Sequence, residues 1–165
     1  MQRLKDRQKA KGFTIIEVLI VLAIAGLILL VVFLAVPALQ RNARNTQRNA
    51  DISGILAAVN EFINNNNGLL PNSAAAANGV VTISNSSVTG TNNTTAKTGY
   101  YRNGGVSWSG SAAGTSGANS TDVDTVIIYS GADCNTLGTQ AINGSSRGVA
   151  ATYMLEATAK QCKSL

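Results

Sequence analysis

The chain has 165 residues, enough for one modest domain and a short additional segment, and it is 45% hydrophobic but only 13% charged. Its net charge of +5 argues little for nucleic-acid binding, because residues 1–12 hold five bases against one acid while the remainder holds eight bases against seven acids. The sequence contains no histidine, and this removes the commonest general base and the commonest metal ligand.

A basic N-terminal segment precedes a long apolar run from Val18 to Val36, nineteen residues without a charge. As a helix, such a run is about 28 Å long, close to the roughly 30 Å hydrocarbon core of a bilayer. The cations before the run predict that the N-terminus stays in the cytoplasm and that the rest of the chain lies outside. Three arginines beyond the run argue the other way but are fewer: Arg41, Arg44 and Arg48.

Two ordinary explanations of this segment leave Glu17 unexplained. A secretory signal peptide also joins a basic start to an apolar run, but that run usually has about 7 to 15 residues and gains nothing from an acid at its border. A plain single-pass membrane anchor accounts for the length of the run and not for Glu17. Because neither explanation accounts for Glu17, a more specific motif is indicated.

The stretch Lys11-Gly12-Phe13-Thr14-Ile15-Ile16-Glu17, with the apolar residues after it, resembles the prepilin processing motif of type IV pilins and related pseudopilins. The resemblance is close from Lys11 to about Ile63 and concerns only the architecture beyond that point. It implies that a membrane aspartyl peptidase cleaves between Gly12 and Phe13. It also implies N-methylation of Phe13, the new N-terminal residue.

An acidic residue at the centre of a membrane helix costs about 2.5 to 3.5 kcal/mol, so Glu17 needs a partner or a position near the interface. Cleavage would create the α-amine of Phe13, which is cationic near neutral pH because such amines have a pKa of about 7.7 to 8.0. Glu17 lies four residues further along, on the same helical face. In the family this charge pair is taken to align an incoming subunit with the growing filament, which implies that Glu17 is the subunit-assembly residue.

After Pro37 the apolar residues follow the spacing of an amphipathic helix, and the stripe ends in a polar segment with Gly68 available for a left-handed cap. One helix of about 70 to 75 Å is therefore predicted from Ile15 to Ile63. Gly26 and Pro37 are its weak points. The stripe consists of Ile52, Ile55, Leu56, Val59, Phe62 and Ile63.

The three arginines of the second helix half lie on one side, at positions i, i+3 and i+7: Arg41, Arg44 and Arg48. This spacing favours a side that faces solvent or lipid headgroups. Contacts with acids of a neighbouring subunit are the alternative.

Residues 64–121 are rich in small polar residues and predict loops with weak strands, such as Val80 to Ile83. Stronger strands are predicted from Val123 to Tyr129 and from Val149 to Leu155, paired in one antiparallel sheet. In pilins such a sheet packs across the amphipathic half of the helix. Sequons such as those at Asn85 and Asn92 arise by chance in this composition and give little reason to expect N-glycosylation.

Cys134 and Cys162 match no C-x-x-C zinc or redox signature, so a disulfide is their simplest use and free thiols are the alternative. Such a bond would staple a C-terminal loop, as is frequent in type IV pilins, and would stabilise it by roughly 3 to 4 kcal/mol. Asp122, Asp124 and Asp133 lack the calcium-loop pattern and favour a solvated turn.

The predicted fold is α+β: a long N-terminal helix, with a protruding apolar half and an amphipathic half, packed against a small antiparallel sheet in the pilin ladle fold. We expect a leader peptide at 1–12 and a transmembrane and polymerisation helix at 13–36. The amphipathic half follows at 37–67, and an extracytoplasmic β-rich head at 68–165. No catalytic, cofactor-binding or metal-binding residue is predicted.

The resemblance implies a structural subunit of a type IV pilus, made as a precursor in the inner membrane with its C-terminus outside and then assembled into an extracellular filament. Its expected partners are other copies of the chain, the prepilin peptidase and N-methyltransferase, and the pilus assembly machinery of the inner membrane. Adhesion, motility and DNA uptake are equally compatible roles. A pseudopilin of a type II secretion system is the alternative, and a membrane-tethered hydrolase is disfavoured because no activating residue accompanies its serines.

Overall fold

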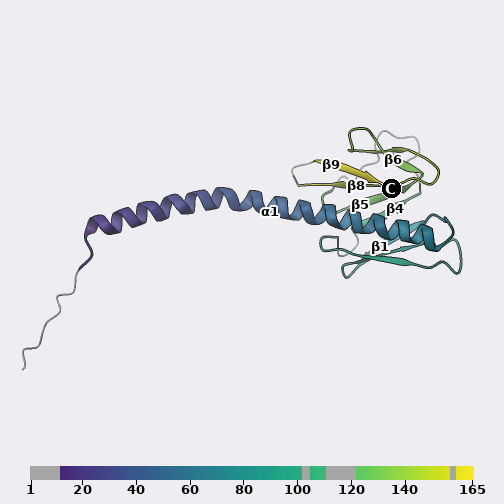
Figure 1. The fold of residues 1–165 in the computed structure, drawn as a ribbon, viewed down its shortest axis with the longest axis horizontal. Helices are drawn as coiled ribbons and strands as arrows, with labels where there is room; N and C mark the ends of the chain where they lie inside the picture. The colour runs from purple at the N-terminus through teal and green to yellow at the C-terminus, as the bar shows by residue number, and fades with distance from the viewer. Residues whose placement is uncertain (1–11, 102–104, 111–121, 157–158) are drawn as a thin grey trace, which may run out of the picture. The chain divides into compact units, whose positions relative to one another are not determined.

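The computed structural model describes residues 12–101, 105–110, 122–156 and 159–165. Within these residues the chain forms one helix and nine strands (Figure 1). The chain divides into two compact units, one up to Gln40 and one from Arg41 to Leu165. The predicted α+β class is confirmed.

The helix α1 runs without interruption over Ile15–Asn65, which is 51 residues or about 76 Å. Gly26 and Pro37 both lie inside it and do not end it. It ends where Asn67 and Gly68 adopt positive φ angles of 54° and 84°, and the Gly68 N–H donates to the Ile63 carbonyl over 2.8 Å. The predicted long helix and its left-handed cap are thus confirmed.

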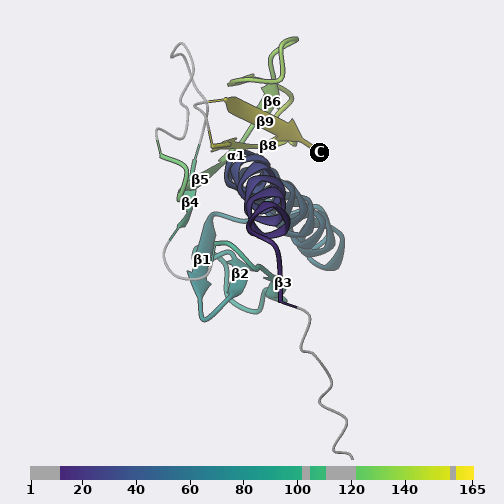
Figure 2. The same ribbon diagram turned by 90° about the vertical axis from the view of Figure 1, so that its left-hand side faces the viewer.

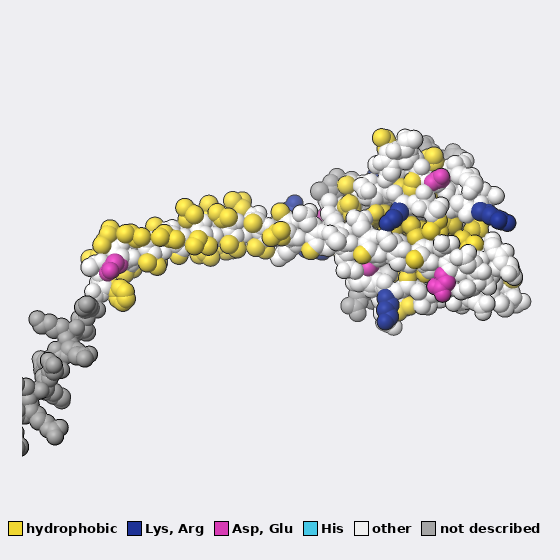
Figure 3. All heavy atoms as spheres, in the orientation of Figure 1, with side chains coloured by type: hydrophobic (Ala, Val, Ile, Leu, Met, Phe, Trp, Pro, Cys, Tyr) yellow, Lys and Arg dark blue, Asp and Glu magenta, His cyan; other side chains and the backbone are white. Residues whose placement is uncertain are grey.

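The first unit contains the apolar part of α1, and all its described residues are exposed. Figure 3 shows an almost wholly apolar surface along this part of the helix. By length and composition α1 could cross a membrane, and its most apolar window has no buried residue. A surface of this kind needs a lipid or protein partner, because soluble monomers rarely expose contiguous apolar patches above a few hundred Å².

In the second unit, α1 buries the predicted amphipathic stripe. Ile52, Ile55, Val59 and Phe62 are fully buried, and Ile63 at the end of the stripe is partly buried. Their neighbours in the core come from several strands, including Val81, Val126, Ile128 and Ala151. Figure 2 shows strands on both sides of the helix, with β1 to β3 on one side and β8 and β9 on the other.

Three strands follow the helix and form an antiparallel sheet in the order β1-β2-β3: β1 (Ser73–Ala77), β2 (Val80–Ser84) and β3 (Thr94–Lys97). Asn78 and Gly79 join β1 to β2, with φ angles of 52° and 76°. Positive φ at both residues of a two-residue connection gives the tight hairpin turn that Asn-Gly favours. The predicted strand Val80 to Ile83 is confirmed as β2.

The second sheet has the order β4-β5-β8-β9: β4 (Val106–Ser109), β5 (Val126–Ser130), β8 (Val149–Met154) and β9 (Lys160–Ser164). Strands β5 and β8 are the two strong predictions, and they pair antiparallel, with Ile128 opposite Ala151. Strand β8 is buried along its whole length. The sheet is not purely antiparallel, since β4 pairs parallel with β5.

A short hairpin of β6 (Ala132–Cys134) and β7 (Ala141–Asn143) carries the first cysteine. Cys134 and Cys162 are bonded as a disulfide, which joins the end of β6 to β9, and the described residues contain no free cysteine. The Cys162 N–H also donates to the Gly138 carbonyl over 2.7 Å. The predicted disulfide is thus confirmed as a staple of the C-terminal region.

Candidate functional site

The N-terminal end of α1 contains the acidic residue that the sequence singles out. Gly12, Phe13 and Thr14 are not helical, and the helix begins at Ile15. Thr14 therefore takes the cap position, and Glu17 is the third helical residue. The pattern Thr-x-x-Glu at these positions is a capping box, in which each side chain bonds to the other residue's backbone N–H.

Three hydrogen bonds form this box. The Thr14 N–H donates to Glu17 Oε2 over 2.9 Å, and the Thr14 hydroxyl donates to the same oxygen over 2.8 Å. In return, the Glu17 N–H donates to Thr14 Oγ1 over 3.4 Å. The Glu17 carboxylate and the Thr14 hydroxyl thus each accept one N–H group at the helix start, where such groups lack partners within the helix. The negative charge of the carboxylate lies at the positive end of the helix dipole.

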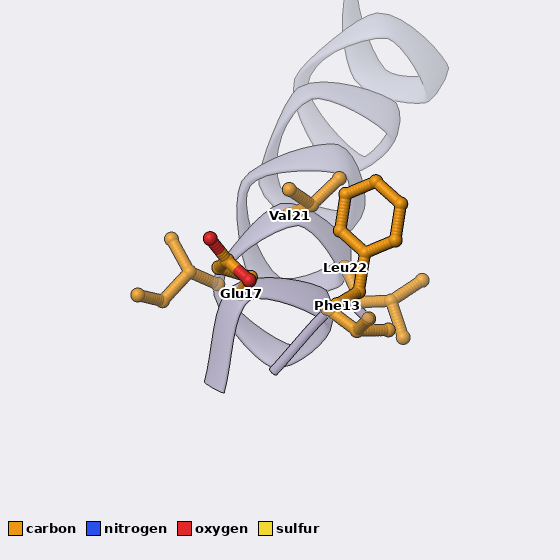
Figure 4. Close-up of a pocket in the computed structure, with 6 residues that line it drawn as sticks. Phe13, Glu17, Val21 and Leu22 are labelled. Carbon is orange, nitrogen blue, oxygen red and sulfur yellow. The ribbon is translucent and has the colours of Figure 1, made fainter. Parts of the chain in front are cut away.

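An open hollow of about 550 Å³ lies beside the box. Apart from the Glu17 carboxylate its walls are apolar, because Phe13, Val18, Ile20, Val21 and Leu22 supply the rest. Figure 4 shows the Phe13 ring and the Glu17 carboxylate on different sides of the first helical turn. The arrangement offers a single carboxylate on an otherwise apolar surface, which suits one cationic group accompanied by apolar neighbours.

A second polar cluster lies in the head, where the helix meets the turn after β8. Arg44 binds both carboxylate oxygens of Glu156, and the contact from Arg44 Nη2 to Oε2 measures 2.8 Å. The Arg44 guanidinium, through these hydrogen bonds, lowers the pKa of Glu156 to about 2. Arg48 Nη2 is 3.4 Å from Glu156 Oε1.

Arg48 is fully buried, and its guanidinium contacts three other residues, although its Nε has no hydrogen-bond partner among the described residues. Its guanidinium stacks 3.9 Å from the centre of the Tyr100 ring and donates to the Tyr100 hydroxyl. It also donates to Asn45 Oδ1 over 2.8 Å, and the same oxygen accepts the Glu156 N–H over 3.0 Å. Such a set of contacts compensates much of the cost of burying a guanidinium.

Asp51, one turn further along the helix, holds the segment after β3. Its carboxylate accepts the backbone N–H groups of Gly99 over 3.1 Å and of Tyr100 over 2.7 Å. It also accepts the side-chain amide of Gln47 over 2.8 Å. A Cβ at position 99 would lie 2.7 Å from Gln47 Nε2, so a larger residue there would require the Gln47 side chain to move.

These contacts correct the expectation for the arginines. Arg41 and Arg44 are exposed, as predicted, but Arg44 also binds Glu156 of the same chain. Arg48 is buried, and its guanidinium lies 3.4 Å from the same carboxylate. Arg48 lies four and seven residues before Ile52 and Ile55, so it falls on the buried stripe. The spacing of Arg48 from these residues could have predicted its burial from the sequence. No local pattern predicted the contacts with Glu156.

Of the remaining candidates, Asp124 is connected to the Arg48 cluster through Tyr100. Asp124 accepts a hydrogen bond from the Tyr100 hydroxyl, and bonds from the Ser164 hydroxyl and the Cys134 N–H lower the pKa of Asp133. In the ranges that the structure describes, no three Cys, Asp or Glu residues come together as a metal site. The Asn85 side chain is engaged at both ends, by Leu70 O and by the Ser87 N–H.

Comparison with known proteins identifies the N-terminal segment. Residues 7–33 match the family described as the prokaryotic N-terminal methylation motif. This match covers Gly12, Phe13, Thr14 and Glu17 together with most of the apolar run. No curated protein and no solved structure matches the chain.

Proposed function

We propose that this chain, a type IV pilin-like protein with a prepilin leader and methylation motif, is a structural subunit of a type IV pilus. The observation that carries the proposal is the apolar surface from Phe13 to Leu39, which is exposed throughout and interrupted by one charge, Glu17. An apolar helix of this length has two natural environments, a bilayer before assembly and a bundle of like helices afterwards.

Processing is the first step of this function. We place cleavage between Gly12 and Phe13, followed by methylation of the Phe13 amine by the prepilin peptidase and N-methyltransferase. Gly12 is exposed, and neither residue is helical, which supports a bond that a peptidase can reach. The leader takes with it four of the five net positive charges, so the mature chain is almost neutral.

Membrane anchoring precedes assembly. The basic leader favours a cytoplasmic N-terminus, and the disulfide fits a head folded in an oxidising compartment outside the cytoplasm. In this orientation the apolar part of α1 spans the inner membrane once, and the inner-membrane assembly machinery withdraws it into the filament. The filament consists of copies of this chain.

In the assembled filament, the Glu17 carboxylate would pair with the amine of Phe13. In the first turn of α1 its carboxylate is the only charge among apolar groups, so a filament of packed helices would have to neutralise it. The methylated amine of Phe13, on the same or a neighbouring subunit, supplies the opposite charge. Glu17→Ala chains should be cleaved like the wild type and should yield few filaments. Normal filament yield from cleaved Glu17→Ala chains would remove this role.

The experiment that tests the proposed function is shearing. Cells that express the chain are sheared, and the released polymer and the cells are assayed separately for the mature polypeptide. A pilus subunit should be a main component of long released filaments. A mature chain that stays with the cells and forms no released polymer would contradict the pilus role and favour a pseudopilin of a type II secretion system.

A further inference from the structure

The surface of the second compact unit carries one large apolar side chain that is almost fully exposed. Leu137 is 80% exposed, more than any other large apolar residue that the structure describes in this unit. The other three are between 44% and 51% exposed: Val88, Ile142 and Leu165. Single apolar residues are common on protein surfaces, so exposure alone assigns no role to Leu137.

The turn that carries Leu137, between β6 and β7, is held by its own hydrogen bonds. Asn135 Oδ1 accepts the N–H groups of Thr139 over 2.8 Å and of Gln140 over 3.2 Å. The Asn135 N–H donates to the Gln140 carbonyl over 2.9 Å, and the Gly138 N–H donates to the Asn135 carbonyl over 2.8 Å. Gly138 has a φ of 64°, in the left-handed region that glycine favours. These contacts fix the backbone on both sides of Leu137.

The turn is also tied to the larger sheet. Cys134, directly before the turn, is bonded to Cys162 of β9, and the Cys162 N–H donates to the Gly138 carbonyl over 2.7 Å. Figures 1 and 2 both show the loop between β6 and β7 at an outer margin of the head. Ordering a loop on binding costs free energy, and in this chain the loop is ordered by folding. Leu137 can therefore bury apolar surface against a partner without that cost.

The distribution of charge indicates which partner fits this turn. The stretch from Cys134 to Ser146, which contains Leu137 and Ile142, has no charged residue, and it lies between one acid and one base, Asp133 and Arg147. Such a surface has no charge to complement a strongly acidic or strongly basic partner. Two copies of it can approach each other without electrostatic repulsion, so the surface is complementary to itself.

We propose that Leu137 forms a contact between copies of the chain in two different filaments, so that pili associate side by side. A contact of the turn with the same turn joins two copies that are related by a twofold axis. Neighbours within one helical filament meet instead through two different surfaces, so the contact of like with like lies between filaments.

This inference rests on the proposed function, because a filament repeats the turn many times along its length. Each contact buries little apolar surface, and repetition along two aligned filaments makes the whole association much stronger than one contact. Charge does not oppose it, since residues 13–165 hold eight bases against seven acids and filaments of a nearly neutral chain repel one another weakly.

The test uses filaments sheared from cells that express the full-length chain. Leu137→Ser removes the apolar side chain, and Leu137→Met keeps its size and apolar character. Val88→Ser is the matched control, because Val88 is also an exposed aliphatic residue but lies between β2 and β3. Bundling is measured as the fraction of released filaments that sediments at low speed, and bundle width by electron microscopy. Filament yield is measured separately on the total released polymer.

We expect wild-type filaments to form bundles, and Leu137→Ser to lower the bundled fraction about fivefold or more with an unchanged filament yield. Leu137→Met and Val88→Ser should bundle like the wild type. Because the contact is apolar, raising sodium chloride from about 0.05 M to about 0.5 M should leave the bundles intact, although it screens interactions between charges.

Several results would overturn the inference while leaving the pilus function intact. Wild-type filaments that remain single would do so, as would Leu137→Ser filaments that bundle like the wild type. Bundles that dissolve at the higher salt concentration would show that charged groups hold them together. A lower filament yield from Leu137→Ser, with an unchanged unfolding midpoint, would place the contact between neighbours of one filament.

A lipid partner would be recognised by flotation with phosphatidylcholine vesicles. Single wild-type filaments that float with these vesicles, when Leu137→Ser filaments do not, would assign the side chain to a lipid surface and contradict the inference. A wild-type chain that is cleaved and releases no filaments would remove the proposed function, and the inference with it.

Discussion

Arg44 donates hydrogen bonds from Nε and Nη2 to the two carboxylate oxygens of Glu156, although the two residues are 112 positions apart in the chain. The pair joins the helix to the turn between β8 and β9, so it closes the head around the second half of α1. A planar guanidinium is suited to this two-point contact in a way that a lysine ammonium is not. Arg48 lies beside this pair, with its Nη2 3.4 Å from Glu156 Oε1.

The pKa of Glu156 predicts how this contact responds to acid. A carboxyl whose folded-state pKa is lowered stabilises the fold above its ordinary pKa of about 4.5 and loses this effect as pH falls toward about 2. We expect the urea midpoint of mature wild-type chain in detergent to fall between pH 4.5 and pH 2 more steeply than that of Glu156→Gln. Equal slopes for the two proteins would show that Glu156 does not carry this pH dependence.

Arg48 and Arg41 both lie on α1, but Arg48 is buried and Arg41 is exposed, so equivalent substitutions at the two positions can be compared. Arg48→Met removes a buried guanidinium that bonds Asn45, Tyr100 and Glu156, so we expect a loss of about 2 to 4 kcal/mol in the free energy of unfolding. Arg41→Met changes an exposed side chain and should stay within about 0.5 kcal/mol of the wild type. Urea unfolding measures both, and equally small effects would mean that Arg48 contributes little to the head.

The buried face of α1 should tolerate truncation poorly. Phe62 is fully buried in the core, and Phe62→Ala should cost about 3 to 5 kcal/mol through lost burial and the cavity left behind. Leu137→Ala is the control, because the Leu137 side chain lies in the disulfide-bounded region and is 80% exposed. Thermal unfolding of the two variants should differ clearly, and similar melting temperatures would contradict the described packing.

The disulfide should stabilise the head by constraining the unfolded chain. Cys134 and Cys162 are 28 residues apart, and removing a bond that closes a loop of this size should cost roughly 3 to 4 kcal/mol in the chain-entropy model. The double variant Cys134→Ser/Cys162→Ser, unfolded in urea beside the oxidised wild type, measures this cost. Reductant should lower the wild-type midpoint toward that of the double variant and leave the double variant unchanged, whereas an unaffected wild type would speak against a stabilising bond.

Local patterns were sufficient for much of this fold. The apolar run and the stripe from Ile52 predicted α1 because helical periodicity persists over many turns. Strands β5 and β8 were predicted from runs that combine β-branched and aromatic residues. Strand β9, Lys160–Ser164, has no such pattern and forms because it completes the edge of the sheet beside β8. Strand β1, Ser73–Ala77, is mostly alanine and depends on the Asn78-Gly79 turn.

The sequence indicated more about the polar contacts of Glu17 than about those of Glu156. Glu17 stood out as an acid beside an apolar run, but its partner Thr14 was overlooked, although Thr-x-x-Glu is a readable capping box. The contacts of Glu156 with Arg44 and Arg48 span more than a hundred residues and arise only once the sheet has folded onto the helix. No pattern within one segment carries that information.

The intact mass of the mature polypeptide tests the central claim most directly. The chain is recovered from sheared filaments and its N-terminus is read by mass spectrometry. We predict a chain that begins at Phe13 and carries one additional methyl group on the Phe13 amine. A chain that retains residues 1–12, or one that begins at another residue, would contradict processing at Gly12 and with it the assembly role assigned to Glu17.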